Sequence, residues 1–292
     1  MTHKAGFVNI IGNPNVGKST LMNAFLGEKL SITTSKAQTT RHRIMGIKNE
    51  EDYQIVFSDL PGILDPHYKL QEKMLGFINQ ALQDADIFVY MLEIGERKYN
   101  EEIVEKIKNT KLPVIVLINK IDKSAQDKIM EEMKYWKGIF PESDVFAISA
   151  LHHFNTQAVL DRILELLPES PPYFPKDEMS DKTLRFFVSE IIREKILLNF
   201  KQEIPYSVEI VVDEFKETAK LIRIKATIFV ARDTQKSILI GKEGQSIKKF
   251  ATQARKDMEQ FLSNKVFLEL FVKVSKNWRD NDLQLKRFGY EN

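Results

Sequence analysis

Residues 12–20, Gly-Asn-Pro-Asn-Val-Gly-Lys-Ser-Thr, decide the fold of the first part of this chain. An apolar run at 7–11 precedes them and predicts a buried strand, and residues 21–26 predict a helix. Between a strand and a helix, the pattern GxxxxGK[ST] is typical of a phosphate-binding loop. Glycines let successive backbone N–H groups turn toward phosphate oxygens, and the helix N-terminus adds the positive end of its dipole. The stretch therefore predicts a nucleoside-triphosphate site.

The side chains of this loop suit the same ligand. Lys18 can reach the outer phosphates, and the Ser19 hydroxyl can bind Mg2+. A chance match in a glycine-containing turn is the alternative, and the flanking strand and helix argue against it. We predict nucleotide contacts from all nine residues: Gly12, Asn13, Pro14, Asn15, Val16, Gly17, Lys18, Ser19 and Thr20.

Composition and charge set outer limits on the protein. The chain has 292 residues, 43% of them hydrophobic and none of them cysteine. This length allows two domains, and a chain without cysteine is compatible with a reducing cytosol. No apolar run approaches the ~20 residues of a membrane span, and the first strand begins too early to leave room for a signal peptide.

The net charge of +2 is unevenly distributed, because residues 184–292 hold 21 Lys and Arg against 15 Asp and Glu. The basic second part suggests an anionic partner other than the nucleotide. Ordinary solvated surface charge is the alternative.

A second loop follows the strand predicted at 53–58. Asp59 stands at the carboxyl end of that strand, where ligands bind open α/β sheets, and it can hold Mg2+ opposite Ser19. Gly62 offers a flexible backbone N–H to a terminal phosphate. Alone, the DxPG turn is common, but forty residues after a phosphate-binding loop it predicts part of the same site. The predicted contacts are Asp59, Leu60, Pro61, Gly62 and Ile63.

A third loop predicts which base is bound. Residues 86–92 and 113–118 are nearly continuous apolar runs, typical of parallel strands covered on both faces. The second run leads into Asn119, Lys120, Ile121 and Asp122. A carboxylate at 122 can accept from both N1–H and the exocyclic amine of guanine, a pair of donors that adenine lacks.

The neighbouring residues can complete a guanine site. The aliphatic stem of Lys120 can lie over the base, and Asn119 can join this loop to the phosphate-binding loop. Ser149 and Ala150 follow a last strand at 145–148 and form a small-residue turn that can close over the base.

The order and spacing of these motifs resemble those of the translation-factor class of GTPases. The resemblance implies a Ras-like fold, GTP hydrolysis with Lys18, Thr40 and Gly62 as catalytic residues, and two switch loops. Thr40 would be the switch threonine that binds Mg2+ together with Ser19 and Asp59, and its neighbour Thr39 is the alternative.

One position departs from the common pattern. Ile63 stands where many Ras-like enzymes carry the glutamine that orients the attacking water, so intrinsic hydrolysis should be slow and the activating group is unknown. In some relatives with a hydrophobic residue here, an asparagine of the phosphate-binding loop holds K+, and Asn15 occupies the matching position. A local backbone cap is the alternative role for Asn15.

The second part of the chain predicts a different fold. Residues 171–183 form a proline-rich linker between a first domain at 1–170 and a second at 184–292. The sequence of the second domain predicts a helix, two strands with alternating apolar residues, a second helix, a third helix and a last strand. The turn between the second and third helices is Gly241-Lys242-Glu243-Gly244. This order resembles a type II KH domain, which implies an RNA interface. The predicted RNA contacts are Ile240, Gly241, Lys242, Gly244, Lys248, Lys249 and Arg255.

The combination of a Ras-like α/β domain with a smaller α+β type II KH domain resembles the bacterial Era GTPases along essentially the whole chain. That resemblance implies binding of GTP and GDP with Mg2+, and of single-stranded small-subunit ribosomal RNA near its end. It also implies a role in small-subunit assembly, cytoplasmic location with peripheral association with the inner membrane, and a monomeric chain.

Two other functions stay open. The chain could be an RNA chaperone or assembly scaffold that keeps GTP as a structural ligand, or a membrane-surface signalling GTPase. Two smaller expectations concern surfaces: the acidic pairs Glu101-Glu102 and Glu131-Glu132 should be solvated helix faces, and the tail aromatics from Trp278 to Tyr290 should dock on the second domain.

Overall fold

The computed structural model describes residues 3–290, which form two compact units. The first unit runs to Asp65 and resumes from Met74 to Asp181. The second contains Pro66–Lys73 and the chain from Lys182 onward. Each unit has its own sheet and its own buried core.

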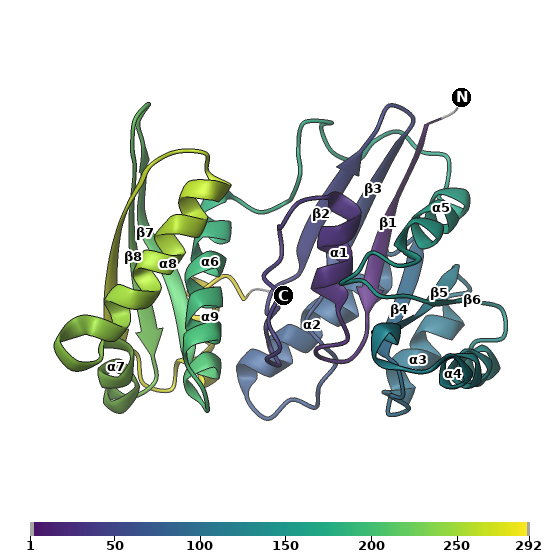
Figure 1. Ribbon diagram of the computed structural model, residues 1–292, viewed down its shortest axis with the longest axis horizontal. Coiled ribbons are helices and arrows are strands. Elements are labelled where there is room, and N and C mark those ends of the chain that lie inside the picture. The colour runs from purple at the N-terminus through teal and green to yellow at the C-terminus, as the bar shows by residue number, and fades with distance from the viewer. Residues whose placement is uncertain (1–2, 291–292) are drawn as a thin grey trace. The chain divides into compact units, whose positions relative to one another are not determined.

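The first unit is built on one mostly parallel sheet (Figure 1) with the strand order β2-β3-β1-β4-β5-β6. Only the β2–β3 pair is antiparallel. The strands are β1 (Lys4–Ile11), β2 (Ile44–Asn49), β3 (Tyr53–Asp59), β4 (Ile87–Glu93), β5 (Val114–Asn119) and β6 (Asp144–Ala147). This mostly parallel sheet confirms the predicted Ras-like α/β class. Its nearly continuous apolar strands need cover on both faces.

Helices cover both faces of this sheet. One face carries the part of α2 (Lys69–Asp84) that follows Lys73, together with α3 (Glu101–Asn109) and α4 (Gln126–Ile139), and their apolar residues share a core with Phe88, Tyr90 and Val116. The other helices, α1 (Lys18–Leu26) and α5 (Thr156–Leu166), contact each other, and α1 packs on β2 and β3. The phosphate-binding stretch is the turn from β1 into α1, as its sequence predicts.

The proline-rich segment lies along the edge strand β2 of the first unit. Ser180 forms an antiparallel bridge with Gly46, and the Ile47 N–H donates to the Met179 carbonyl at 2.9 Å. The buried Gln54 side chain accepts from the backbone N–H groups of Tyr173 and Phe174 at 2.7 and 3.0 Å. The segment therefore extends the sheet by a few irregular pairs and is not a free connector.

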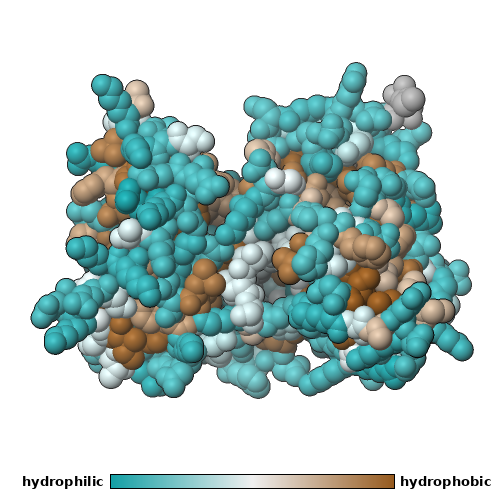
Figure 2. Space-filling view, viewed as in Figure 1, coloured by the Kyte–Doolittle hydropathy of each residue, from teal (hydrophilic) through white to brown (hydrophobic). Residues whose placement is uncertain are grey.

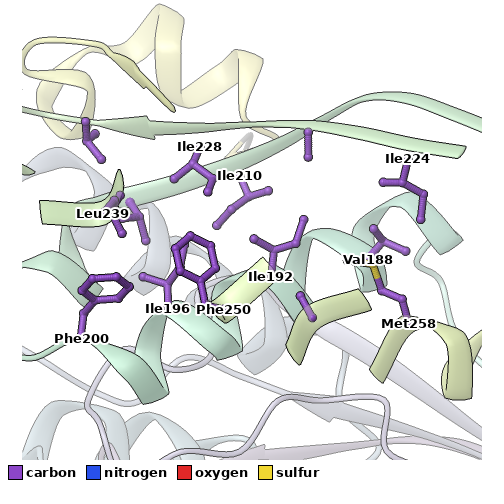
Figure 3. Close-up of a cluster of buried hydrophobic side chains, with 14 of the residues drawn as sticks. Val188, Ile192, Ile196, Phe200, Ile210, Ile224, Ile228, Leu239, Phe250 and Met258 are labelled. Carbon is purple, nitrogen blue, oxygen red and sulfur yellow. The ribbon is translucent and has the colours of Figure 1, made fainter. Parts of the chain in front are cut away.

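The second unit is a three-stranded sheet with two long helices on one face. Strands β7 (Val208–Glu217) and β8 (Ile222–Val230) are antiparallel, and β9 (Val266–Val274) runs parallel to β8. The helices are α6 (Leu184–Asn199) and α8 (Gln245–Phe261), with the short α7 (Asp233–Ile240) before α8. Figure 3 shows Ile196 of α6 beside Phe250 of α8, and Val188 of α6 beside Met258 of α8, in the core between helices and sheet.

Strand β7 continues past Val212, where the alternation of apolar residues in its sequence is interrupted. A bulge between Val212 and Glu214 shifts the register by one residue, so Phe215 returns to the core face. Because a one-residue shift exchanges the two faces of a strand, the pattern looks broken in the sequence although the strand continues.

The tail docks on the second unit, as predicted. Trp278 is fully buried and its Nε1–H donates to the Ser207 carbonyl at 3.1 Å. Phe288 packs on Trp278 and Phe229, with ring centroids 5.6 and 5.2 Å apart. The segment forms the short helix α9 (Asp282–Arg287), which ends just before these aromatic contacts.

The surface prediction for the two acidic pairs is wrong at one of its four residues, since Glu131 is exposed and Glu132 is not. Glu101 and Glu102 are exposed, but Glu132 is only 2% exposed and pairs with Arg97 at 3.1 Å. A partner from a distant loop draws this carboxylate inward, which the pattern of α4 alone could not predict.

Elsewhere the surface is ordinary. Hydrophilic residues cover most of the face in view in Figure 2. Within residues 3–290, no helix has the length and apolar character needed to cross a membrane.

Candidate nucleotide and nucleic-acid sites

The carboxyl ends of the parallel strands surround a cavity of about 580 Å³ in the first unit. All the motif loops predicted from the sequence contribute to its lining. Its walls include Asn15, Lys18, Ser19, Thr40, Gly62, Asn119, Lys120, Asp122 and Ser149. The fold thus brings together residues that are up to 134 positions apart in the chain, from Asn15 to Ser149.

The phosphate-binding loop depends on two close approaches of the backbone. Gly17 has φ of +110°, and a Cβ there would lie 2.3 Å from the Asn119 side chain. A Cβ at Gly62 would lie 2.6 Å from the backbone of Pro14. Only glycine fits either position. At Gly17 the left-handed backbone and the short distance both exclude a side chain, and at Gly62 the short distance alone does so.

Lys18 lies inside this loop. Its Nζ donates to the carbonyl oxygens of Gly12 and Asn13 at 3.1 and 2.8 Å. Burial lowers the pKa of Lys18 to about 8, with smaller opposing contributions from Asp59 and Glu96. A buried ammonium aimed into a cavity beside a helix N-terminus is suited to an anionic ligand.

Three side chains with oxygen atoms meet beside Lys18. The Ser19 hydroxyl lies 2.7 Å from Asp59 Oδ2 and 2.9 Å from the Thr40 hydroxyl, which itself donates to Asp59 Oδ2 at 3.1 Å. Burial raises the pKa of Asp59, and its Oδ1 has no hydrogen-bond partner among the described residues. A buried, orphaned carboxylate oxygen beside two hydroxyl groups suits Mg2+, which prefers hard oxygen ligands.

The structure separates the two candidate switch threonines. The Thr40 hydroxyl faces Ser19 and Asp59, whereas the Thr39 hydroxyl donates to the Lys36 carbonyl at 2.6 Å and lies 2.7 Å from the Thr34 hydroxyl. Ile63 is buried in the core beneath α2, α3 and α4, and its N–H donates to the Gly12 carbonyl. Its side chain has no polar atom for a water molecule.

The predicted base loop is tied to the phosphate-binding loop. Asn119 donates from Nδ2 to the Val16 carbonyl at 2.7 Å and accepts at Oδ1 from the Ala150 N–H at 2.9 Å. The Ser149 hydroxyl donates to Asp122 Oδ1 at 2.6 Å, and this bond holds the pKa of Asp122 below its usual value. Asp122 therefore remains an ionised acceptor in the cavity wall.

In the second unit, Gly241–Gly244 makes a sharp turn between α7 and α8. Gly241 and Gly244 both have positive φ, and a Cβ at Gly241 would lie 2.6 Å from Ser246. Lys242, Lys248 and Lys249 are exposed around this turn. Together they offer bare backbone and mobile charge, which is what a nucleic-acid backbone needs for close approach.

Two residues near this turn differ from the sequence interpretation. Arg255 is bound to Glu259 at 2.8 Å on the same helix, so it is less available to an RNA than the three lysines. Ile238 is 49% exposed and was not among the predicted contacts, although it precedes the glycine turn by three residues on α7. The feature of the sequence that could have indicated Ile238 is an apolar residue on the outer side of a short helix next to the glycine turn.

The fold and these two sites define a P-loop GTPase of Ras-like fold joined to a KH domain. A family model described as 50S ribosome-binding GTPase matches residues 7–120, and one described as KH domain matches residues 203–279. The chain belongs to the Era family of GTPases. It is 44% identical to GTPase Era of Geotalea daltonii and 41% identical to that of Clostridium kluyveri, and the matches cover 98% and 99% of both chains, respectively.

Solved structures give the same result. A structure of Era with MgGDPNP and nucleotides 1506–1542 of 16S ribosomal RNA matches with a TM-score of 0.95 and 39% identity. The match covers 99% of this chain and 100% of that one. A variant of Aquifex aeolicus Era bound to GDP and AlF4− matches with the same score, identity and coverage.

Proposed function

We propose that this chain is a GTP-operated switch that binds small-subunit ribosomal RNA through its KH domain and assists small-subunit assembly. The observation that supports this most directly is the glycine turn between α7 and α8, carried on the same chain as the nucleotide cavity. The relative crystallised with a 16S RNA fragment matches this chain over both domains.

In the proposed nucleotide site, Gly12–Thr20 cradles the phosphates, and Asn119–Asp122 with Ser149 and Ala150 recognises guanine. Ser19, Thr40 and Asp59 would hold Mg2+, which neutralises phosphate charge when bound. The assignment rests on the hydrogen bonds that join Asp59 to Ser19 and Thr40, which both line the cavity, and on the unpaired Asp59 oxygen.

Hydrolysis should be slow without a partner, because Ile63 cannot orient water. We propose that K+ supplies some of the missing positive charge through Asn15, which lines the cavity and whose amide now donates to the Ser35 carbonyl at 3.1 Å. GTP turnover should be several-fold faster in KCl than in NaCl, and Asn15→Ala should remove the difference. Equal wild-type rates in the two salts would refute the potassium role.

The RNA interface proposed here comprises Gly241, Lys242, Gly244, Lys248 and Lys249. Ile238 and Ile240 would pack against bases, and Arg255 would contribute after release from Glu259. The three lysines supply phosphate contacts, so their combined effect should depend on salt concentration.

The test compares binding of a fragment containing nucleotides 1506–1542 of 16S RNA with binding of a scrambled fragment. Lys248→Gln with Lys249→Gln should weaken binding about tenfold or more at low salt, and Lys276→Gln with Lys220→Gln is the matched control for loss of two exposed charges. GDP affinity reports whether the first domain is intact. RNA affinity that does not change in the Lys248 and Lys249 variant would rule out this interface.

A scaffold that keeps GTP as a structural ligand would show no turnover even with RNA and K+. Domain boundaries at 1–170, 171–183 and 184–292, a monomeric state, and a cytoplasmic location with peripheral membrane association remain predictions. Light scattering tests the monomeric state, and flotation with anionic vesicles tests the membrane association.

A further inference from the structure

We propose that the end of β4 and the turn after it position both the base-binding loop and the phosphate-binding loop of the nucleotide site, with Glu93 and Glu96 as positioning residues. This inference rests on the proposed nucleotide site, and it assigns roles to two carboxylates that belong to none of its motifs. Glu93 ends β4, and Glu96 lies three residues later in the loop that leads to α3.

Glu93 holds the base end of the site. It is the last residue of β4, it lines the cavity, and in the parallel register it stands beside Asn119 of β5. Its Oε2 pairs with Lys120 Nζ at 2.5 Å, and its Oε1 lies 3.6 Å from Lys123 Nζ. The pair fixes the ammonium of the lysine whose stem is proposed to cover guanine.

Glu96 holds the phosphate end. Its Oε1 accepts from Asn13 Nδ2 at 2.7 Å, and the same amide donates to the Lys98 carbonyl at 2.8 Å. Asn13 in turn offers its own carbonyl to Lys18. The Glu96 carboxylate thus fixes Asn13, near the start of the phosphate-binding loop. The Asn13 side chain does not line the cavity, and its amide is held by two acceptors.

The two anchors are joined to each other. Glu96 Oε2 accepts from the Glu93 N–H at 3.2 Å, and the Glu96 N–H donates to the Glu93 carbonyl at 2.9 Å. A continuous set of contacts therefore runs from Asn13 through Glu96 and Glu93 to Lys120. Two carboxylates near a polyphosphate site would otherwise repel the ligand, and here each is matched by donors on the protein.

Substitutions of the two carboxylates should differ in their effects on the binding of GDP and of GMP. Glu93→Gln breaks the ion pair with Lys120 and should raise the Kd of GDP and of GMP by the same factor, about fivefold. Glu96→Ala removes one of the two acceptors that hold the Asn13 amide and should raise the Kd of GDP by about fivefold while that of GMP changes less than about twofold. Glu96→Gln keeps an oxygen for the Asn13 amide and should restore GDP binding.

Competition with a fluorescent GDP derivative measures these constants on the full chain. Glu102→Gln, which removes an exposed carboxylate of α3, is the matched control and should bind both nucleotides as the wild type does. Equal weakening of GDP and GMP by Glu96→Ala, or unchanged binding by both variants, would overturn the inference.

Asp122→Asn separates this inference from the site on which it rests. An amide at 122 should favour xanthine over guanine nucleotides, because it can donate to the xanthine oxygen. If that switch occurs and the Glu93 and Glu96 variants behave as wild type, only the anchoring role fails. If Asp122→Asn keeps its preference for guanine, the assigned base site is wrong and the anchoring role fails with it.

Discussion

Asp59 accepts a hydrogen bond of 2.7 Å from Ser19, although forty residues separate the two in the chain. The strand β3 delivers the carboxylate and the first turn of α1 delivers the hydroxyl, so the fold brings the pair together. The carboxylate is fully buried and its pKa is raised by that burial. A cation at this place would relieve the desolvation of the ionised form.

Replacing Asp59 by Asn should therefore separate metal binding from folding. We expect the Mg2+ concentration that supports half-maximal GTP binding to rise by about tenfold or more, since the one charged ligand is lost. The unfolding free energy of the ligand-free protein should not fall, because burial of the ionised carboxylate is itself costly and outweighs its hydrogen bonds in raising the pKa of Asp59. Asp52→Asn, in an exposed turn, is the control, and an unchanged Mg2+ requirement in Asp59→Asn would exclude the metal role.

Nucleotide affinity should depend on pH through Lys18, whose pKa is lowered to about 8 by burial. Phosphate oxygens favour the charged form and raise that pKa in the complex, so binding above pH 8 takes up a proton. The Kd of GDP should be constant below pH 8 and rise about tenfold per pH unit above it, until the pKa of the complex is reached. Lys18→Arg stays charged and should lack the inflection; an inflection retained in that variant would assign it to another group.

Stability of the ligand-free protein should change in the opposite direction over part of this range. Lysine in the unfolded chain titrates near 10.5, so the unfolded state binds more protons between pH 8 and 10.5. The contribution of Lys18 to the unfolding free energy should therefore increase with pH in that window. Denaturant titrations of wild type and Lys18→Met at several pH values isolate it, because methionine does not titrate.

Gly62→Ala should impair hydrolysis more than binding. A Cβ at this position would lie 2.6 Å from the Pro14 backbone and would push the two loops apart. We expect GTP turnover to fall by about tenfold or more with GDP affinity near that of wild type, since small displacements at a reacting centre are costly. Gly138→Ala lies in α4 with nothing within 4 Å and should leave turnover unchanged. Comparable losses in both variants would contradict the close-approach argument.

Trp278→Ala should destabilise the KH domain. The indole is fully buried and donates to the Ser207 carbonyl, so its removal leaves a cavity and an unpaired acceptor. The cost should be about 3–5 kcal/mol in chemical denaturation followed by a probe in the second unit. Leu283→Ala, where the side chain is 80% exposed, should cost little, and GDP affinity should not change in either variant. A loss below about 1 kcal/mol for Trp278→Ala would mean that the tail is only loosely held.

Sequence alone predicted those parts of the fold and site that have a local pattern. The phosphate-binding loop and the apolar parallel strands are such cases, since their spacing is imposed by backbone geometry. The end of β7 could not be predicted in the same way, because its bulge at Val212 and Glu214 exchanges the faces of the strand. On each side of the bulge the residues alternate as in a strand, but the core-facing and solvent-facing positions are exchanged between the two halves.

Side chains whose role depends on distant partners also escaped prediction. Glu132 is buried because Arg97 reaches it from another loop, and nothing within α4 signals this. Glu93 and Glu96 are likewise ordinary acidic residues until the sheet brings them to Lys120 and Asn13. By contrast, the sequence left two candidates for the switch threonine, Thr39 and Thr40. Only the direction of their hydroxyl groups in the structure distinguishes the two.

The segment paired with β2 has a practical consequence for dissecting the protein. A fragment ending at residue 170 would lose the partners of the Ile47 N–H and of the Gln54 side-chain oxygen, and would leave an open sheet edge. Such edges recruit strands from other molecules. A GTPase fragment that retains residues 171–181 keeps its own cover, so it should remain dispersed at concentrations where the shorter fragment self-associates.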